Sequence, residues 1–389
     1  MQNRPAVRRD LLPFGTTIFA EMTALAIQHG AVNLSQGFPD FDGPEFVRSA
    51  AAKAVMEGPN QYARSMGLPE LVQAVAAKVK RQYGVELDPN RQVTVFSGAT
   101  EGLFSSIMGL LEPGDEVVLF EPFYDSYPVC TVLAGATPRY CTLRWPGFAF
   151  DREELASLFT DRTRLVVLNT PHNPSGKVFT PDEIAFVGSL CEKHGAYLLT
   201  DEVYEHLTYG VDHVPAATLP GLAERTLTIS STGKTFSLTG WKIGYAWGPE
   251  ELVAAAQAAH QFVTFATASP LQWAMAQALA APDSFYEELR NEYAERRDFL
   301  VGVLRDAGFE VAEPSGTYFV MADVSRFGFE DDCAFARHLT TEVGVACIPP
   351  SVFYAKEKAQ GRRLARFAFC KKMETLKEAA RRLERLKTA

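Results

Sequence analysis

The middle of the chain alternates short apolar, β-branched runs with longer stretches of helical periodicity. The runs that predict strands cover residues 93–96, 116–120, 163–168, 197–200, 226–230 and 243–247. An apolar helix is expected over 103–111, after the first of these runs. Strands that alternate with helices predict an α/β fold with a mostly parallel sheet. In such sheets ligands bind at the carboxyl ends of the strands, and the polar motifs of this chain follow the predicted strands.

The final third of the chain has a different pattern. A long charged helix is expected over 285–304, and strand-like runs follow at 317–321, 344–348 and 366–369. The last helix carries apolar residues on one face, at Leu376, Ala379, Ala380, Leu383 and Leu386. This pattern predicts a smaller α+β domain. We expect an N-terminal arm and part of the small domain in 1–45, the large domain in 46–284, and the small C-terminal domain in 285–389.

Composition and charge are those of a globular enzyme and exclude several other classes. The 389 residues are enough for two domains of about 150 residues each. The net charge is −9 and no basic block stands out, which argues against nucleic acid and an anionic membrane as partners. No apolar span of about 20 residues is present. Because the N-terminus shows no apolar signal core, a cytoplasmic location is expected.

Cysteine and histidine usage points away from disulfides and metals. The six cysteines are widely spaced and none forms a Cys-x-x-Cys pair, so reduced and mostly buried thiols are expected. The seven histidines form no His-Glu-x-x-His motif and no cluster with cysteine. No metal site is therefore expected.

The most informative segment is 230–242, which places Lys234 after a predicted strand among small and hydroxylic residues. A lysine in a tight turn at a strand end can approach a phosphate-bearing cofactor and bond covalently to its aldehyde, as pyridoxal phosphate is anchored. A solvated loop lysine is the alternative. Two other motifs share these letters. The Ser-x-x-Lys motif lacks its Lys-Thr-Gly and Ser-Asp-Asn partners, and Thr228 stands where a P-loop requires glycine.

Two further strand ends carry polar side chains. Asp201 ends an apolar run, and a buried carboxylate there requires a partner such as a protonated pyridine nitrogen. The alternative is an N-cap of the next helix. The segment 169–176, Asn-Thr-Pro-His-Asn-Pro-Ser-Gly, predicts a rigid turn after another strand. Asn169 and Asn173 would present amide donors to a ring hydroxyl or a substrate carboxylate, unless the segment is a plain loop.

Three more positions have residue types that suit a ligand. The segment 97–102, Ser-Gly-Ala-Thr-Glu-Gly, opens a helix, and its small residues let backbone N–H groups approach a phosphate. Tyr124 follows the strand at 116–120 and offers a face for ring stacking, with core packing as the alternative. Arg366 lies in an apolar run. Because arginine is rarely buried alone, it either clamps a carboxylate or forms an internal salt bridge.

These motifs and their order resemble the class I aminotransferases of the pyridoxal phosphate fold type I superfamily, over essentially the whole chain. Within that family the chain looks most like the kynurenine/glutamine aminotransferase branch, and especially its bacterial methionine aminotransferases. The segments that carry the resemblance are 16–19, 33–44, 60–62, 169–174, 201–206, 233–236, 239–242 and 348–353. Phe19 and His172 stand where kynurenine aminotransferases tend to have Trp and Asn, which fits the methionine type better. The family fold has a large, mostly parallel seven-stranded sheet domain and a smaller α+β domain.

The resemblance implies how a cofactor would be held. Lys234 would bond to pyridoxal 5′-phosphate and carry a proton between the substrate Cα and the cofactor. Asp201 would pair with the pyridine nitrogen and Tyr124 would stack on the ring. Tyr204 and Asn173 would hydrogen-bond the ring hydroxyl. The phosphate would be held by Gly98, Ala99, Thr100, Ser231 and Lys242, with Tyr62 reaching in from the neighbouring subunit.

The resemblance also implies a substrate site. Arg366 would clamp the α-carboxylate, helped by Asn169 and the backbone of Gly37. Phe19, Phe38 and Phe265 would form an apolar pocket for the substrate side chain. The expected function is a homodimeric aminotransferase with shared active sites. It would move an amino group from methionine, or another large neutral or aromatic amino acid, to a 2-oxo acid by a ping-pong route.

Three alternatives remain open from the sequence. The chain would act on kynurenine or glutamine if it belongs to the sister branch. It would be a C–S β-lyase if loss of a thiolate from Cβ outpaced return of the proton. A ligand-sensing regulator that kept the aminotransferase body is disfavoured, because the stretch before Asn33 is too short for a DNA-binding module.

Overall fold

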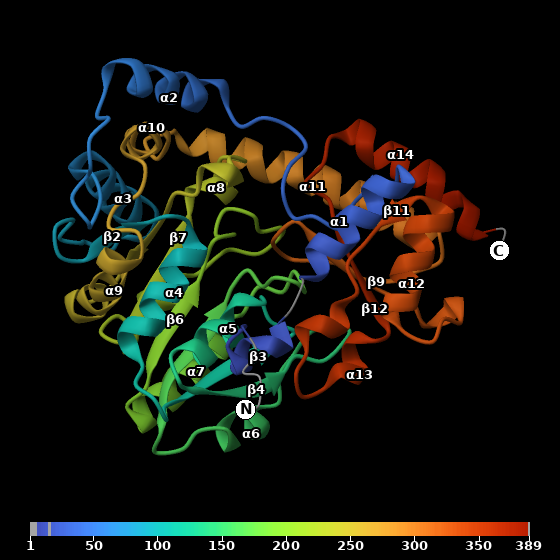
Figure 1. Cartoon of the computed structure of the whole chain (residues 1–389), viewed down its shortest axis with the longest axis horizontal. Helices are drawn as coiled ribbons and strands as arrows, with labels where there is room; N and C mark the ends of the chain where they lie inside the picture. The colour runs from blue at the N-terminus through green and yellow to red at the C-terminus, as the bar shows by residue number, and fades with distance from the viewer. Residues whose placement is uncertain (1–5, 15–16, 388–389) are drawn as a thin grey trace.

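The computed structural model describes residues 6–14 and 17–387. Residues 1–5 of the expected arm and Thr16 of the 16–19 motif lie outside the described residues. The largest element is a seven-stranded sheet with the order β2-β8-β7-β6-β5-β3-β4 (Figure 1). Its strands are β2 (Val93–Phe96), β3 (Glu116–Glu121), β4 (Thr137–Thr142), β5 (Thr163–Asn169), β6 (Tyr197–Asp201), β7 (Thr226–Ser231) and β8 (Gly244–Trp247). Only the pairs that involve β8 are antiparallel, so the predicted seven-stranded, mostly parallel sheet is confirmed.

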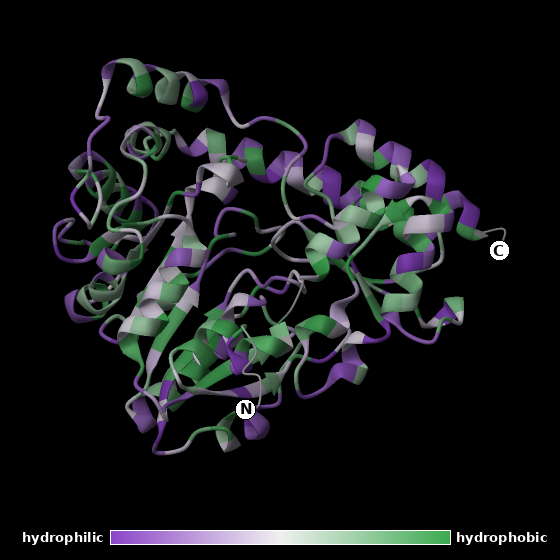
Figure 2. Cartoon of the chain, in the orientation of Figure 1, coloured by the Kyte–Doolittle hydropathy of each residue, from purple (hydrophilic) through white to green (hydrophobic). Residues whose placement is uncertain are grey.

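Helices cover both faces of this sheet, which explains why its strands are continuous apolar runs. In β3, Val117 and Leu119 pack with α4 (Ala99–Leu110), α5 (Ser126–Leu133) and α9 (Glu250–Val263). Val118 and Phe120 point to the opposite face, against α6 (Arg152–Ser157) and α7 (Pro181–His194). The sheet strands are accordingly among the most hydrophobic segments in Figure 2.

A third layer of helices packs near the β2–β8 edge. It consists of α2 (Glu45–Glu57), α3 (Pro69–Tyr83) and α10 (Ser269–Ala278), and α10 contacts both α2 and α3 (Figure 1). Val93 and Val95 of β2 belong to the same apolar cluster as α3 and α10. This layer closes the end of the sheet where the single antiparallel strand β8 lies.

The C-terminal part is a separate apolar cluster around a three-stranded antiparallel sheet with the order β12-β10-β9. The strands are β9 (Glu310–Ala312), β10 (Phe319–Asp323) and β12 (Leu364–Ala368), and the helices are α11 (Asp283–Asp306), α12 (Asp332–His338), α13 (Lys358–Gly361) and α14 (Met373–Leu383). The N-terminal helix α1 (Ile18–His29) packs into this cluster, and β1 (Val32–Asn33) pairs in parallel with β11 (Val345–Ala346). The domain boundaries at 45 and 284 remain predictions.

Several expected elements differ in extent from those observed. The strand β4 was not expected, because half-buried polar residues interrupt its apolar pattern. The helix expected from residue 103 starts at Ala99, so the small residues of the 97–102 segment form its first turn. The turn expected around Lys234 is a short helix, α8 (Thr232–Thr235). On the last helix Leu376, Ala379 and Leu383 are buried as predicted.

Two further properties of the chain bear on its chemistry. Within residues 6–14 and 17–387, no helix is long and apolar enough to cross a membrane. All six cysteines are free thiols, and five of them are buried. Burial raises the pKa of Cys130, Cys141 and Cys191 to about 12, so these thiols stay protonated and unreactive.

Candidate active site

A cavity of about 380 Å³ lies where the sheet meets the C-terminal part. Three neighbouring parallel strands end at it, since Asn169, Asp201 and Ser231 are the last residues of β5, β6 and β7. The predicted site residues that line this cavity are Phe19, Gly37, Gly98, Ala99, Thr100, Tyr124, Asn169, Asn173, Asp201, Tyr204, Ser231, Lys234, Lys242 and Arg366, together with Phe38. Residues separated by up to 347 positions in the sequence, from Phe19 to Arg366, therefore share one cavity.

Lys234 reaches this cavity from the short helix α8, directly after β7. Its Nζ donates a hydrogen bond to the Tyr318 hydroxyl at 3.0 Å. Burial lowers the pKa of Lys234 to about 8 and outweighs the opposing effect of Asp201. About a tenth of the amine is therefore neutral at pH 7, far more than for an ordinary lysine. Neutral amines are the nucleophilic and proton-accepting form. This placement argues against a solvated loop lysine.

Asp201 is a buried carboxylate at the end of β6. Tyr127 donates its hydroxyl hydrogen to Oδ2 at 2.7 Å, and the Val203 N–H donates to Oδ1 at 3.3 Å. Burial raises the pKa of Asp201 to about 6, and these hydrogen bonds only partly oppose it. Within the described part of the chain no cation forms an ion pair with it. The residues after it form turns and no helix, so it does not serve as the N-cap of a long helix.

The burial of Asp201 predicts that Asp201→Asn makes the cofactor-free chain more stable at alkaline pH. The rise of its pKa from 3.8 to about 6 means that the folded chain binds more protons than the unfolded chain between these values. The free energy of unfolding therefore falls as pH rises through this window, by about 3 kcal/mol. Asparagine has one acceptor oxygen and loses one of the two hydrogen bonds, which costs about 1 kcal/mol.

We thus expect Asp201→Asn to stabilise the cofactor-free chain by about 2 kcal/mol at pH 8. The advantage should decline below about pH 6 and vanish near about pH 4. Thermal or urea unfolding at several pH values measures it. A variant that is less stable than wild type at pH 8 would contradict the burial argument.

Asn169, Asn173 and Arg366 form one connected group. Asn169 donates Nδ2–H to the Asp201 carbonyl and accepts the Asn173 N–H, both at 2.7 Å. Arg366 donates Nη1–H to the Asn173 Oδ1 and Nη2–H to the Ser35 carbonyl, both at 3.0 Å. The Asn173 side-chain oxygen is thus an acceptor for arginine, and this contact leaves the two Nδ2–H groups as the donors predicted for a ligand. The segment is a structured support for the cavity and not a plain loop.

Arg366 is 1% exposed, and its guanidinium lies 4.1 Å from the centroid of the Phe319 ring. Burial lowers its pKa to about 10, so it remains a cation. No carboxylate within the described residues forms an ion pair with it, which removes the internal salt bridge as an explanation. Among the residues that the structure describes, its Nε has no hydrogen-bond partner. A buried guanidinium with a free donor on a cavity wall is suited to a carboxylate ligand.

The first turn of α4 also lines the cavity. Gly98 has a φ of +84°, and a Cβ there would lie 2.9 Å from Cε of Lys242. Gly244 of β8 packs equally closely, because a Cβ on it would lie 2.5 Å from the Ala99 nitrogen. Glycine is required at both positions. The result is a helix N-terminus with a lysine ammonium group beside it, which is a favourable place for an anion.

The predicted aromatic residues take different positions. Tyr124 lines the cavity, with its hydroxyl 3.5 Å from Thr100 Oγ1. Tyr204 is buried, and its ring lies edge-on to Tyr318 at 5.0 Å. Burial raises the pKa of both tyrosines, so both remain phenols that can donate a hydrogen bond. Tyr124 is therefore placed for ligand contact and is not simply packed in the core.

Tyr62 and Phe265 do not line the cavity. They lie together on the surface with ring centroids 5.5 Å apart, and Tyr62 is 87% exposed. Of the three residues expected to form the side-chain pocket, Phe19 and Phe38 line the cavity of this chain and Phe265 does not. Phe265 follows the end of α9 with a φ of +64°, on a surface that the sequence pattern does not locate.

Four residues around the cavity were not anticipated from the sequence: Gln36, Asp125, Tyr127 and Tyr318. Tyr127 holds Asp201, and Tyr318 holds Lys234. Tyr127 lies three residues after Tyr124, which was a usable signal. Tyr318 lies next to the apolar strand β10 and has the pattern of a core residue, so only the tertiary structure reveals its contact.

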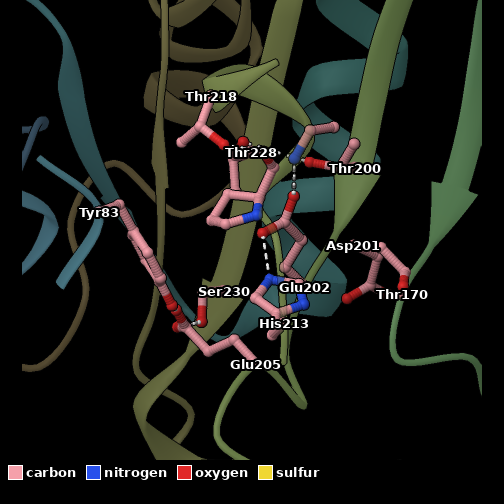
Figure 3. Close-up of polar contacts among 12 residues, drawn as sticks. Tyr83, Thr170, Thr200, Asp201, Glu202, Glu205, His213, Thr218, Thr228 and Ser230 are labelled. Atoms are coloured by element: carbon pink, nitrogen blue, oxygen red, sulfur yellow. Dashed lines mark hydrogen bonds and ion pairs between the residues drawn. The ribbon is translucent and has the colours of Figure 1, made fainter. Parts of the chain in front are cut away.

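The segment that carries Asp201 and Tyr204 is held in place by two of its own buried acidic residues, Glu202 and Glu205. Figure 3 shows Glu202 beside His213, whose Nε2 lies 2.7 Å from Glu202 Oε2. Glu205 accepts hydrogen bonds from Tyr83 and Ser230. It also forms a buried ion pair with Lys78. Because the partners of Glu205 come from α3 and β7, the segment is fixed independently of any ligand.

One other group of side chains has the donor types of a metal site. Ligand atoms of Asp331, Asp332 and Cys333 lie within 4.8 Å of one another. Asp331 caps α12 by accepting the Ala334 N–H, and Asp332 accepts the Ser351 N–H. Both carboxylates already have structural roles at the start of α12.

Comparison with known proteins agrees with the geometry of the cavity. The family model "Aminotransferase class I and II" matches residues 29–383. A probable N-succinyldiaminopimelate aminotransferase from Mycobacterium tuberculosis is 45% identical over 384 residues, covering 96% of both chains. The methionine aminotransferase of Escherichia coli is 42% identical over 388 residues, covering 99% of this chain and all of the relative. A kynurenine–oxoglutarate transaminase from Dictyostelium discoideum is 40% identical, covering 96% of this chain and 95% of the relative.

Solved structures give the same result. The M. tuberculosis enzyme superimposes with a TM-score of 0.95 and the E. coli methionine aminotransferase with 0.94, each covering 98% of this chain and all of the other. An aspartate aminotransferase from Thermus thermophilus, 32% identical, covers 98% of this chain and all of the other with a TM-score of 0.90. Members of the matched family generally depend on pyridoxal phosphate. The predicted family is confirmed: the chain belongs to the class I and II aminotransferases and is an aminotransferase.

Proposed function

We propose that this aminotransferase uses pyridoxal 5′-phosphate to move the amino group of methionine, or another large neutral or aromatic amino acid, to a 2-oxo acid. The observation that carries the proposal is one cavity whose wall contains Lys234, the buried carboxylate of Asp201 and the buried guanidinium of Arg366. We also propose that it works as a cytoplasmic homodimer.

The donor set of the cavity fits pyridoxal phosphate. Asp201 is a buried anion without a cation partner among the described residues, and a protonated pyridine nitrogen would supply one. The first turn of α4 (Gly98, Ala99, Thr100), Ser231 and Lys242 would hold the phosphate. Tyr124 would cover the ring, and Tyr204 and Asn173 would lie at the ring hydroxyl. When bound, the cofactor supplies an electron sink that makes the substrate Cα–H bond acidic.

The residues of the chain would then do three things. Arg366 would bind the α-carboxylate through its free Nε–H and fix the orientation of Cα, with Asn169 and the Gly37 backbone beside it. Lys234 would anchor the cofactor. As a neutral amine it would also take the proton from the substrate Cα and carry it to the cofactor. The aromatic walls would exclude water from this proton transfer.

The preference for a neutral side chain rests on the cavity walls. Phe19 and Phe38 line it, and the centroid of the Phe19 ring lies 5.2 Å from the Arg366 guanidinium. Among the described residues that line the cavity, the basic side chains are Lys234, Lys242 and Arg366. Lys234, Lys242 and Arg366 each have a role above, so none of these described cavity residues is left to bind a second substrate carboxylate. An amino acid such as methionine or phenylalanine therefore fits better than a dicarboxylate.

A second copy of the chain would complete the site. Tyr62 and Phe265 form an exposed aromatic pair, and Met56 and Phe262, within six residues of the pair in the sequence, are more than four-fifths exposed. Large exposed aromatic and apolar side chains mark association surfaces. We propose that this surface pairs with a second copy, so that Tyr62 reaches the phosphate and Phe265 the substrate pocket of the neighbouring subunit.

A single-turnover absorbance experiment tests the proposed function. The loaded enzyme is mixed with methionine, phenylalanine, kynurenine, glutamine, aspartate or N-succinyldiaminopimelate, without an acceptor. Conversion of the bound cofactor to its amino form, fastest with methionine or phenylalanine, is the expected result. Fastest conversion with kynurenine or glutamine would move the chain to that branch, and fastest conversion with a dicarboxylate would contradict the pocket argument. Pyruvate release from cystathionine without conversion would make it a β-lyase.

The phosphate site predicts a selective effect of Gly98→Ala. The new Cβ would lie 2.9 Å from Lys242 Cε and displace the ammonium group from the first turn of α4. We expect the affinity for pyridoxal phosphate to fall at least about tenfold, or about 1.4 kcal/mol. Gly84→Ala is the matched control, because Gly84 has a φ of +72° and open space around it. Gly84→Ala should introduce only the strain of an alanine at positive φ, without a steric clash. Equal losses of affinity in both variants would contradict the prediction.

A further inference from the structure

A chain of two hydrogen bonds links the amine of Lys234 to the backbone of the N-terminal loop. Lys234 Nζ lies 3.0 Å from the Tyr318 hydroxyl, and that hydroxyl lies 2.6 Å from the Gly37 carbonyl oxygen. Lys234 belongs to α8, Tyr318 directly precedes β10, and Gly37 lies in the loop after β1. Tyr318 therefore connects the reactive lysine to a loop that borders the substrate side of the cavity.

The direction of both hydrogen bonds follows from the number of protons. A carbonyl oxygen only accepts, so the single hydroxyl hydrogen of Tyr318 is donated to Gly37. The Tyr318 oxygen then has only lone pairs for Lys234, whose Nζ must donate. Burial raises the pKa of Tyr318 well above its usual value, so it remains a phenol. Tyr318 thus orients the amine and does not exchange a proton with it.

Tyr318 is held rigidly enough to orient another group. It is 1% exposed and packs between the ring of Tyr204 at 5.0 Å and the stacked ring of Tyr293 at 6.1 Å. The preceding residue, Thr317, has a φ of +64°, which is unusual for a β-branched residue. Thr317 is held there by Tyr209, whose hydroxyl donates to its carbonyl at 2.6 Å. Strain of this kind persists where the surrounding structure enforces it and is common at functional sites.

The Gly37 carbonyl, which accepts the hydrogen bond from Tyr318, is also held in place. A Cβ on Gly37 would lie 2.5 Å from Cζ of Phe319, so the loop backbone packs directly on the ring beside Tyr318. Two neighbouring carbonyls of the same loop are also bound, Ser35 by Arg366 at 3.0 Å and Phe38 by Lys371 at 2.7 Å. The Gly37 oxygen therefore keeps a constant position relative to Tyr318.

We infer that Tyr318 is a positioning residue that holds one N–H of Lys234 and thereby directs the lone pair of the neutral amine for proton transfer at the substrate Cα. The inference rests on the proposed function of Lys234. When the amine is released from the cofactor, its four-carbon side chain has several rotamers, and only a fixed acceptor selects one of them. Without Tyr318, the amine would spend most of its time in orientations that do not reach Cα.

Tyr318→Phe tests this inference, because it removes the hydroxyl and keeps the ring packing. Tyr293→Phe is the matched control: Tyr293 is equally buried and stacks on Tyr318, but its hydroxyl contacts Ser237 and not Lys234. In the loaded enzyme we expect Tyr318→Phe to slow single-turnover conversion by methionine at least about tenfold. The substrate isotope effect at Cα should rise, while Tyr293→Phe stays within about twofold of wild type.

A second readout does not depend on turnover. The rate at which the full-length, cofactor-free chain bonds covalently to pyridoxal phosphate follows the neutral fraction of Lys234, so its pH midpoint reports the pKa of that amine. A hydrogen bond to the hydroxyl favours the ammonium form, so its loss in Tyr318→Phe should lower the midpoint by about half a pH unit or more. An unchanged midpoint, or a shifted midpoint with an unchanged turnover rate, would overturn the inference. Failure of wild type to convert any amino acid would instead refute the proposed function.

Discussion

Lys234→Ala is expected to lower the rate of transamination by at least about 10³-fold, because it removes the amine that carries the proton. It also removes the Nζ that donates a hydrogen bond to the Tyr318 hydroxyl. Lys234→Arg should be nearly as inactive, since guanidinium stays protonated and cannot act as a base. Steady-state rates with methionine and a 2-oxo acid, together with the absorbance of the bound cofactor, measure both effects.

The control for these variants is Lys356→Ala. Lys356 is a half-exposed lysine that pairs with Glu154 outside the cavity, and such pairs contribute little to stability. The transamination rate of Lys356→Ala should match that of wild type. Retention of more than about a tenth of wild-type turnover by Lys234→Ala would remove Lys234 from the proposed mechanism.

The second large effect is expected for Arg366→Lys. Lysine keeps the charge but has no second donor at the position of the free Nε–H and cannot stack its head group on Phe319 as guanidinium does. Loss of a buried, charge-assisted contact costs about 3 to 4 kcal/mol, so kcat/KM should fall by about 10² to 10³-fold for every amino acid tested. A common loss is expected because all substrates share the α-carboxylate.

Arg363→Lys is the matched control, three residues earlier and next to the same strand. Arg363 Nε donates to Asp323 at 2.6 Å, so this arginine has the internal carboxylate partner that Arg366 lacks. The change should affect stability slightly and leave kcat/KM unchanged. If Arg366→Lys lowered kcat/KM only for substrates with one type of side chain, Arg366 would contact the substrate side chain and not the α-carboxylate.

The sequence predicts the large sheet well because its physical cause is local. Strands buried on both faces become continuous apolar runs, and a polar residue that ends such a run lies at the carboxyl edge of a parallel sheet. Asn169, Asp201 and Ser231 each end a strand in this way, which is why they could be placed together before the structure was known. The strand β4 was missed because its exposed edge position makes it less apolar.

The parts of the site that could not be predicted depend on contacts between distant segments. Tyr318 and Gly37 are 281 positions apart, and nothing in the local pattern of either indicates their hydrogen bond. The acceptor role of Asn173 is likewise a consequence of Arg366 lying beside it, 193 positions away. Phe265 was assigned to the cavity by resemblance, and its surface position beside Tyr62 shows that a single chain does not bring it there.

The measurement to make is the location of the covalent bond to the cofactor. The chain loaded with pyridoxal phosphate is treated with borohydride, which makes the bond permanent, and its peptides are analysed by mass spectrometry. The geometry predicts a single modified peptide containing Lys234, modified in wild type and Lys356→Ala but not in Lys234→Ala. Modification at Lys242 or another lysine instead, or no stable modification, would contradict the assignment of the cavity as the cofactor site.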